Sequence, residues 1–290
     1  MGDKTAIAWT QASWNPLRGC TRVSAGCEHC YAEQVAARFS GPGQPYEGLA
    51  ILTPSGARWT RKVVLVEEHL RDPLRWQRPR RVFTNSMSDL FHESVPDEWL
   101  YRILAVMAAA KRHTFQTLTK RAERMRDFLT GIDTEHLAWH INQLLGRSHF
   151  GESVRMPLRN CWWGVSVEDE PTARLRLPHL METPAAIRFI SYEPILGPVN
   201  FQEWLPTRGP QDGWHGLSTR FTSPTLDWII LGGESGPRHR PCKLEWIESA
   251  VHQCQQAGVP VFVKQDSGSK PGKQGRIPDA LWALKEYPQC

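Results

Sequence analysis

The stretch Arg81–Leu118, RVFTNSMSDLFHESVPDEWLYRILAVMAAAKRHTFQTL, contains in one unit the alternation on which the fold depends. Its two ends, RVFTN at 81–85 and TFQTL at 114–118, are short runs rich in apolar and β-branched residues, which favour strands. Between them, Asp97–Lys111 follows a proline and begins with acidic residues, as helices often do. A strand, a helix and a second strand in this order indicate two parallel strands joined by a crossover helix.

The same alternation continues along the chain. Further apolar runs lie at 162–167, 187–191, 228–231 and 259–264, and further helical patterns lie at Arg121–Thr130, Asp169–Met181 and Leu244–Ala257. With a seventh strand near the N-terminus, they predict an α/β fold in one domain, residues 1–290, built as a partial or complete (β/α) barrel. The turn sequence TPSG within 51–66 predicts a β-hairpin, and the Gly-, Pro- and Ser-rich segment 201–224 predicts a long insertion.

The composition is that of an ordinary globular protein. The chain has 290 residues, 40% hydrophobic and 22% charged, with a net charge of +5 that permits nucleic-acid binding without requiring it. No run of eighteen apolar residues occurs, and the N-terminus lacks the basic start and apolar core of a secretory signal. We therefore expect a cytoplasmic protein with no membrane partner.

Cysteines are concentrated near the N-terminus. Of seven, three fall within eleven residues, Cys20, Cys27 and Cys30, with the spacing C-x6-C-x2-C. Such clustering in a cytoplasmic chain indicates a metal site before a disulfide. Gly19 and Gly26 allow the loop to fold back on itself. A helical pattern from Gln34 would place the positive end of a helix beside the thiolates, which favours their charged form.

Three interpretations of the cluster remain open. A structural zinc site needs four ligands, and only His29 lies nearby, in a position where it would be strained as a ligand. The cysteines could also be three unrelated thiols of a loop. The third interpretation is an iron–sulfur cluster bound by three cysteines, with one iron left open for a substrate or cofactor.

The segment NPLRGC-(x6)-CEHCYAE, from Asn15 to Glu33, resembles the cluster loop of radical S-adenosylmethionine enzymes, particularly the spore photoproduct lyase-like branch. The spacing in that superfamily is C-x3-C-x2-C, so three extra residues separate Cys20 from Cys27 here. Over nearly its whole length, with the segments NSMSDLFH and GGESG, the chain is similar to a phage- and bacteria-associated three-cysteine-motif family. The resemblance implies a radical SAM-type barrel with a [4Fe–4S] cluster, S-adenosylmethionine, an external electron donor and a neighbouring partner protein.

Polar residues follow several predicted strands, where the sites of (β/α) barrels lie. Ser86, Ser88 and Asp89 could accept the ammonium group of the methionine part, and Lys120 could bind a carboxylate or phosphate. Further candidates for ribose, adenine and carboxylate contacts are Ser166, Glu168, Glu193, Gly232, Gly233 and Glu234. Each has a simpler interpretation as a turn, a cap or a solvated carboxylate.

Two further features bear on the substrate. Cys161 could donate a hydrogen atom, as a cysteine does in lesion-repairing members of the lyase branch, although such a residue is more often a small buried hydrophobe. Basic residues near the loop and after GGESG could track a phosphate backbone or simply face solvent: Arg18, Arg22, Arg38, Arg238, His239 and Arg240.

Two hypotheses follow. The first is an enzyme that uses the cluster and S-adenosylmethionine for radical chemistry, on a nucleic-acid base in DNA lesion repair or modification. The second is a non-radical zinc or iron–sulfur barrel protein that binds nucleic acid or a partner protein.

Overall fold

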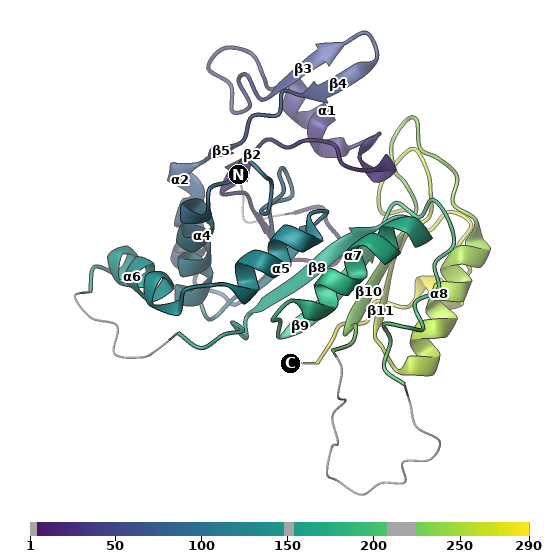
Figure 1. The fold of residues 1–290 in the computed structure, drawn as a ribbon. Coiled ribbons are helices and arrows are strands. Elements are labelled where there is room, and N and C mark those ends of the chain that lie inside the picture. The colour runs from purple at the N-terminus through teal and green to yellow at the C-terminus, as the bar shows by residue number, and fades with distance from the viewer. Residues whose placement is uncertain (1–4, 148–153, 208–223, 290) are drawn as a thin grey trace, which may run out of the picture.

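A computed structural model describes residues 5–147, 154–207 and 224–289 (Figure 1). Its centre is a seven-stranded, fully parallel sheet in the order β1-β6-β7-β8-β9-β10-β11, curled into a half barrel. The strands are β1 (Ala12–Trp14), β6 (Arg81–Thr84), β7 (Thr114–Thr119), β8 (Cys161–Val167), β9 (Ile187–Tyr192), β10 (Trp228–Gly232) and β11 (Val261–Gln265). The predicted partial barrel and its seven strands are confirmed.

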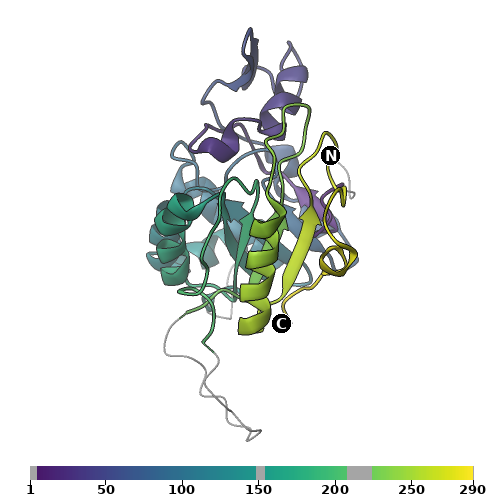
Figure 2. The same cartoon turned by 90° about the vertical axis from the view of Figure 1, so that its right-hand side faces the viewer.

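Helices cover the outer face of the sheet (Figures 1 and 2). The crossovers contain α4 (Asp97–Ala109), α5 (Ala122–Thr130), α6 (Thr134–Leu145), α7 (Glu170–Glu182) and α8 (Leu244–Ala257), and α9 (Asp279–Trp282) follows β11. Apolar residues of these helices pack on outward-facing strand residues such as Phe115, Trp163 and Ile229, and this layer is the main core. The four predicted helices are confirmed, whereas α6 was not predicted.

The inner face of the sheet differs from one end to the other. Aromatic and branched side chains fill the end nearest the strand starts: Trp9, Phe83, Trp162, Ile187, Phe189, Trp228, Ile230 and Phe262. Strand pairing places Trp162 beside Ile187, Gly164 beside Phe189, and Ser166 beside Ser191 on this face. The face therefore changes from apolar to polar toward the carboxyl ends of the strands.

The first part of the chain between β1 and β6, residues 17–65, lies over those carboxyl ends (Figures 1 and 2). It contains β2 (Leu17–Arg18), the 3-10 turn η1 (Ala25–Cys27), α1 (Tyr31–Arg38), the hairpin strands β3 (Ala50–Thr53) and β4 (Gly56–Trp59), and β5 (Val64–Leu65), followed by α2 (Glu67–Leu70) and α3 (Asp72–Arg75). We call residues 17–65 the cap. The hairpin predicted within 51–66 is confirmed, with its turn at TPSG.

The segment predicted as an insertion is only partly described. Its start packs against the main core, because Phe201, Trp204 and Leu205 are buried and Phe201 contacts the ring of Tyr192. Residues 208–223 of the predicted insertion lie outside the described residues. In the described parts of the chain, none of the helices combines the length and apolar character that crossing a membrane requires.

Candidate functional site

The three clustered cysteines lie on the loop that leads from β2 to α1. Cys27 ends η1, and Cys30 immediately precedes α1, whose first-turn amides at Ala32 and Glu33 point at its sulfur. A thiolate is favoured at this end of a helix by the exposed amides and the helix dipole. The prediction that the loop precedes a helix start is confirmed, although the helix begins three residues earlier than Gln34.

The sulfur atoms of Cys20, Cys27 and Cys30 are free thiols of intermediate burial. Within the described chain, they do not all lie within 4.8 Å of one another. One zinc ion bound tetrahedrally at about 2.3 Å would hold them about 3.8 Å apart, so this arrangement is not a closed zinc site. The thiols nevertheless interact electrostatically, since charge on Cys27 and Cys30 raises the pKa of Cys20.

Burial raises the pKa of two of the clustered thiols, those of Cys20 and Cys30. Desolvation is the largest cause that raises the pKa of Cys20 to about 12; the charge of Asp89 adds to it and the charge of Arg121 opposes it. Desolvation likewise raises the pKa of Cys30. At Cys30 desolvation outweighs the helix amides, so near neutral pH both Cys20 and Cys30 are protonated when no cation is bound, and a cation that binds them must displace their protons.

Arg121 holds the first part of the loop. Its guanidinium lies 3.9 Å from the sulfur of Cys20 and donates to the hydroxyl of Thr21 at 2.7 Å. Asp89 fixes this buried guanidinium at 3.0 Å and also accepts from the Thr119 hydroxyl and the Lys120 amide. Burial alone would raise the pKa of Asp89, but Arg121 and these hydrogen bonds hold it below its usual range. In this structure Asp89 positions Arg121, because both its oxygens are used within the protein.

Glu168, which follows β8, supports the middle of the loop. It is fully buried and accepts hydrogen bonds from Arg176 at 2.9 Å and from the hydroxyl of Ser24 at 3.1 Å. Gly26 lies directly on this carboxylate, since a Cβ there would be 2.4 Å from Oε1 of Glu168. Glycine is therefore required at this position for close contact, without any unusual backbone angle.

Glu234, after β10, holds the last part of the loop. Its carboxylate pairs with Arg240 at 2.6 Å and contacts Nδ1 of His29 at 3.1 Å. Arg240 then donates to the carbonyl oxygen of Ala25 at 2.9 Å and pairs with Glu28 at 3.1 Å. His29 is thus engaged by Glu234 from outside the loop. Although burial raises it, the hydrogen bonds from Arg240 and His29 leave the pKa of Glu234 lowered.

A second group of charged side chains is less enclosed. Lys120 lies 3.6 Å from Glu168, while Glu193 pairs with Lys264 at 2.5 Å and accepts from Gln265 at 3.2 Å. Lys120, Glu193 and Lys264 come from the ends of β7, β9 and β11, and each side chain is about a fifth exposed. They provide two cations and one carboxylate near the polar end of the inner face. Ser166 is buried on the same face beside Ser191.

Two buried amides on or beside this face have no partner within the described protein. Neither amide atom of Asn85, directly after β6, nor of Gln116, in β7, has a hydrogen bond in the part of the chain that the structure describes. Asn85 also has a φ of +65°, an uncommon backbone conformation outside glycine. Leaving a buried polar group unpaired typically costs about 1–3 kcal/mol. These amides fit a polar ligand that enters the half barrel.

Cys161 lies away from the other predicted site residues. Cys161 begins β8, so it lies about 20 Å, six residues of strand, from the carboxyl end; it is buried against Met107. This position corrects the hydrogen-donor prediction, because a donor must reach the substrate. A buried environment without nearby charges raises the pKa of Cys161 and leaves an inert thiol.

Ser86, Ser88 and the two glycines contact the chain itself. The hydroxyl of Ser86 donates to the side chain of Asn15 and that of Ser88 to the carbonyl of Leu17, which fixes the start of the cap. A Cβ on Gly232 would lie 3.1 Å from Glu193, and one on Gly233 would lie 2.2 Å from the backbone nitrogen of Ser267. At both glycines the space that a side chain would need is filled by protein groups, which explains the absence of a Cβ.

The sequence reasoning missed the residues that hold the loop. Arg121 adjoins the predicted Lys120, and its position after a strand was an available signal. Arg240 was interpreted as a surface or phosphate-binding residue, but it forms an ion pair beneath the loop. No local sequence pattern indicated the roles of Arg176, which donates to Glu168, or of His92, which contacts Thr21 at 3.0 Å.

Comparison with known proteins gives one match. Residues 4–279 match the model of a family described as Protein of unknown function (DUF5131). No curated protein and no solved structure matches the chain significantly. A function must therefore be inferred from the residues of the chain itself.

Proposed function

The chain belongs to the DUF5131 family of proteins of unknown function, and we propose that it is an iron–sulfur enzyme that uses S-adenosylmethionine for radical chemistry. In this proposal Cys20, Cys27 and Cys30 hold a [4Fe–4S] cluster. One observation supports this proposal. Three free thiols that interact electrostatically lie on one loop, and the buried carboxylates of Glu168 and Glu234 hold this loop by hydrogen bonds at the carboxyl ends of the parallel strands. When bound, the cluster and S-adenosylmethionine would supply one-electron cleavage, driven by an external electron donor, and hydrogen abstraction from a substrate.

The residues around the loop have defined tasks in this proposal. Arg121 offsets the negative charge that develops at Cys20. The ion pair with Asp89 keeps the guanidinium of Arg121 in its position beside this sulfur. Lys120 and Lys264 are placed to bind a carboxylate, and Glu193 can accept hydrogen bonds from an ammonium group or ribose hydroxyls. The unpaired amides of Asn85 and Gln116 can bind polar ligand atoms. The aromatic side chains at the end of the inner face nearest the strand starts exclude water from that side.

A nucleic-acid base is the substrate class that the cap supports best, with DNA lesion repair or modification as the reaction. Tyr31, next to Cys30, and Phe39, directly after α1, are exposed aromatic residues on which a base can stack. Arg38 and Arg61 are exposed on the same segment and can contact phosphates.

A second candidate function is a non-radical zinc or iron–sulfur protein that binds nucleic acid or a partner protein. The cap favours it through exposed apolar side chains: Val23, Ile51, Leu52 and Val64. Where such exposed apolar groups form one contiguous patch, they are typical of an interaction surface.

The cleavage of S-adenosylmethionine separates the two candidates. Anaerobically reconstituted protein is reduced in the presence of S-adenosylmethionine, and 5′-deoxyadenosine is measured. We expect product from the wild type and at least about tenfold less from Glu193→Gln, corresponding to one lost charge-assisted hydrogen bond. Iron content should not change in this variant.

Lys243→Ala is the control, because Lys243 is exposed at the start of α8, where it pairs with the exposed Glu245 and not with the charged side chains at the strand ends. It should cleave as the wild type does. A protein with its full iron content that forms no 5′-deoxyadenosine would contradict the enzyme and favour the binding protein.

A further inference from the structure

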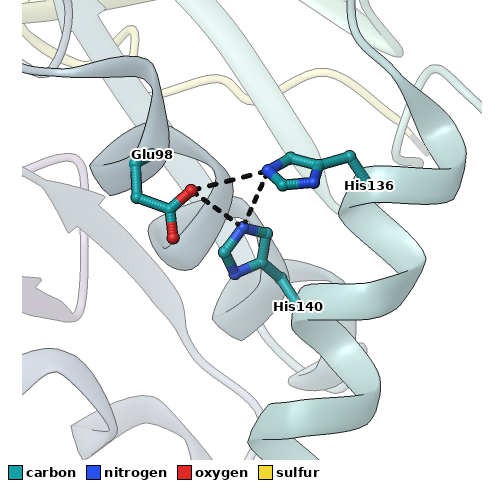
Figure 3. Close-up of side chains that lie close together, drawn as sticks. All are labelled: Glu98, His136 and His140. Carbon is teal, nitrogen blue, oxygen red and sulfur yellow. Dashed lines mark hydrogen bonds and ion pairs between the residues drawn. The ribbon is translucent and has the colours of Figure 1, made fainter.

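Three metal-ligating side chains meet between two helices outside the cysteine site (Figure 3). Nε2 of His136 and Nε2 of His140 are 3.2 Å apart, and Oε2 of Glu98 lies 3.5 Å from the first and 3.4 Å from the second. All three ligand atoms point at one common position. In the described part of the chain, this is the one group of three such residues whose ligand atoms lie this close together.

The sequence and the packing of two helices produce this arrangement. His136 and His140 are four residues apart on α6, so their side chains project from one face. Asp133 caps the start of α6 by accepting from the amide of His136, which fixes the first turn. Glu98 comes from the first turn of α4, against which α6 lies (Figure 1). The ring of Tyr101 stacks on His140 and meets the edge of His136, so both imidazoles are held in place.

Hydrogen bonds among Glu98, His136 and His140 cannot satisfy all three of the ligand atoms that face one another. A neutral imidazole carries one proton, and a carboxylate carries none. If His140 donates to His136, it cannot also donate to Glu98, and His136 then has no proton at Nε2 to offer. If both imidazoles donate to Glu98, two N–H groups face each other across 3.2 Å. A cation at the common position would accept all three lone pairs at once.

The distances between the three ligand atoms indicate which class of cation fits. A tetrahedral ion with bonds of about 2.0–2.1 Å places its ligand atoms about 3.3 Å apart, within the observed range of 3.2–3.5 Å. Right-angled octahedral bonds of the same length would bring the atoms to about 2.9 Å. We propose that Glu98, His136 and His140 form a tetrahedral site for a divalent ion of the zinc class, which links α4 to α6.

The three protein ligands leave the fourth position of the ion free. Two histidines, one carboxylate and a water molecule are the ligand set of catalytic zinc sites, whereas structural sites are closed by four protein ligands. A cleft of about 530 Å³ lies beside the group, lined by Glu98, His140, Arg102 and Trp139 among others. The sequence between the histidines, Leu-Ala-Trp, lacks the glutamate that follows the first histidine in zinc peptidases, so peptidase chemistry does not follow.

Cobalt(II) binding to the full-length chain tests this site. Because thiols also bind such ions, the measurement uses a Cys20→Ser, Cys27→Ser, Cys30→Ser background, with folding checked by circular dichroism. Equilibrium dialysis should find about one cobalt per chain, with the absorption of tetrahedral cobalt and no sulfur-to-cobalt charge-transfer band. The result does not depend on the proposed iron–sulfur function, because the cluster ligands are absent.

Variants in the same background locate the ion. Glu98→Gln and His136→Ala should weaken cobalt binding by more than about 100-fold, since even an outer-shell partner of a metal ligand is worth 10–100-fold. Glu98 and His136 are 54% and 42% exposed, so neither substitution is expected to prevent folding. His252→Ala, an exposed histidine of α8, is the control and should leave the affinity unchanged. A folded background protein that binds no cobalt, or binding that survives both substitutions, would overturn the site.

Discussion

Gly26 lies directly against the carboxylate of Glu168, the residue after β8. The Glu168 carboxylate beneath it cannot move aside, because Arg176 holds it in a fully buried position. A side chain at Gly26 must therefore lift the loop, and with it Cys27.

We predict that Gly26→Ala lowers the free energy of unfolding by about 1–3 kcal/mol, as overpacking a close contact does. It should also reduce the iron bound after reconstitution, which metal analysis would show. Gly268→Ala is the control, because nothing lies within 4 Å of a Cβ at that position. Equal behaviour of the two variants would show that the loop does not rest on Glu168.

The buried pair of Asp89 and Arg121 gives a prediction about pH. Breaking such a pair costs about 3–5 kcal/mol, so Asp89→Asn should be strongly destabilised at neutral pH. The pKa of Asp89 is lowered on folding, so its stabilisation is complete above the unfolded value of about 3.9 and is lost as the pH falls through the folded value. The difference in unfolding free energy between the wild type and Asp89→Asn should therefore shrink below about pH 4.

Denaturant unfolding at several pH values measures this difference. Asp127→Asn, at an exposed carboxylate on α5, should change stability little at any pH. A difference for Asp89→Asn that stays constant down to pH 2 would mean that Asp89 is not charged in the folded protein.

At the scale of elements, α7 has the best-defined start. Asp169 accepts from the amide of Thr172, and the Thr172 hydroxyl contacts the backbone of Asp169 in return. We predict that Asp169→Ala lowers the free energy of unfolding by about 1 kcal/mol, the usual value of an N-cap. Thermal unfolding would show a decrease of a few degrees, whereas Glu123→Ala, in the exposed first turn of α5, should change it far less. No decrease would mean that tertiary packing alone fixes this helix.

Most elements could be predicted because their signals are local. The strands at 81–84 and 187–192 are short β-branched and aromatic runs, and α8 ends at Gly258 as the sequence indicates. Helix α6 was missed because a strand–helix–strand pattern requires one helix in each crossover, and the connection between β7 and β8 contains two. Its spaced histidines at 136 and 140 were nevertheless a visible metal-site signal.

The supports of the cysteine loop could not be predicted, because they join distant parts of the chain. Ser24 and Glu168 are 144 residues apart, and His29 and Glu234 are 205 apart. Sequence spacing carries no information about such pairs. It did indicate that polar residues after the strands meet at one edge, and Lys120, Glu168, Glu193 and Glu234 are there.

For the whole molecule, the half barrel separates two environments. An aromatic layer closes one end of the inner face, and the cap with its cysteine loop covers the other. Between them lie the amide of Asn85, directly after β6, and the charged strand ends, while the amide of Gln116 lies level with Phe83 and Trp162 of the aromatic layer. This arrangement suits chemistry that needs a polar ligand held away from bulk water.

Iron and acid-labile sulfide per chain, measured after anaerobic reconstitution, test the role of the three cysteines most directly. We predict about four of each in the wild type and in Cys254→Ala, whose thiol is buried on α8, and a loss of most of both in Cys20→Ser, Cys27→Ser or Cys30→Ser. A colourless wild type with one zinc ion, or iron that remains after any of the three substitutions, would contradict the cluster.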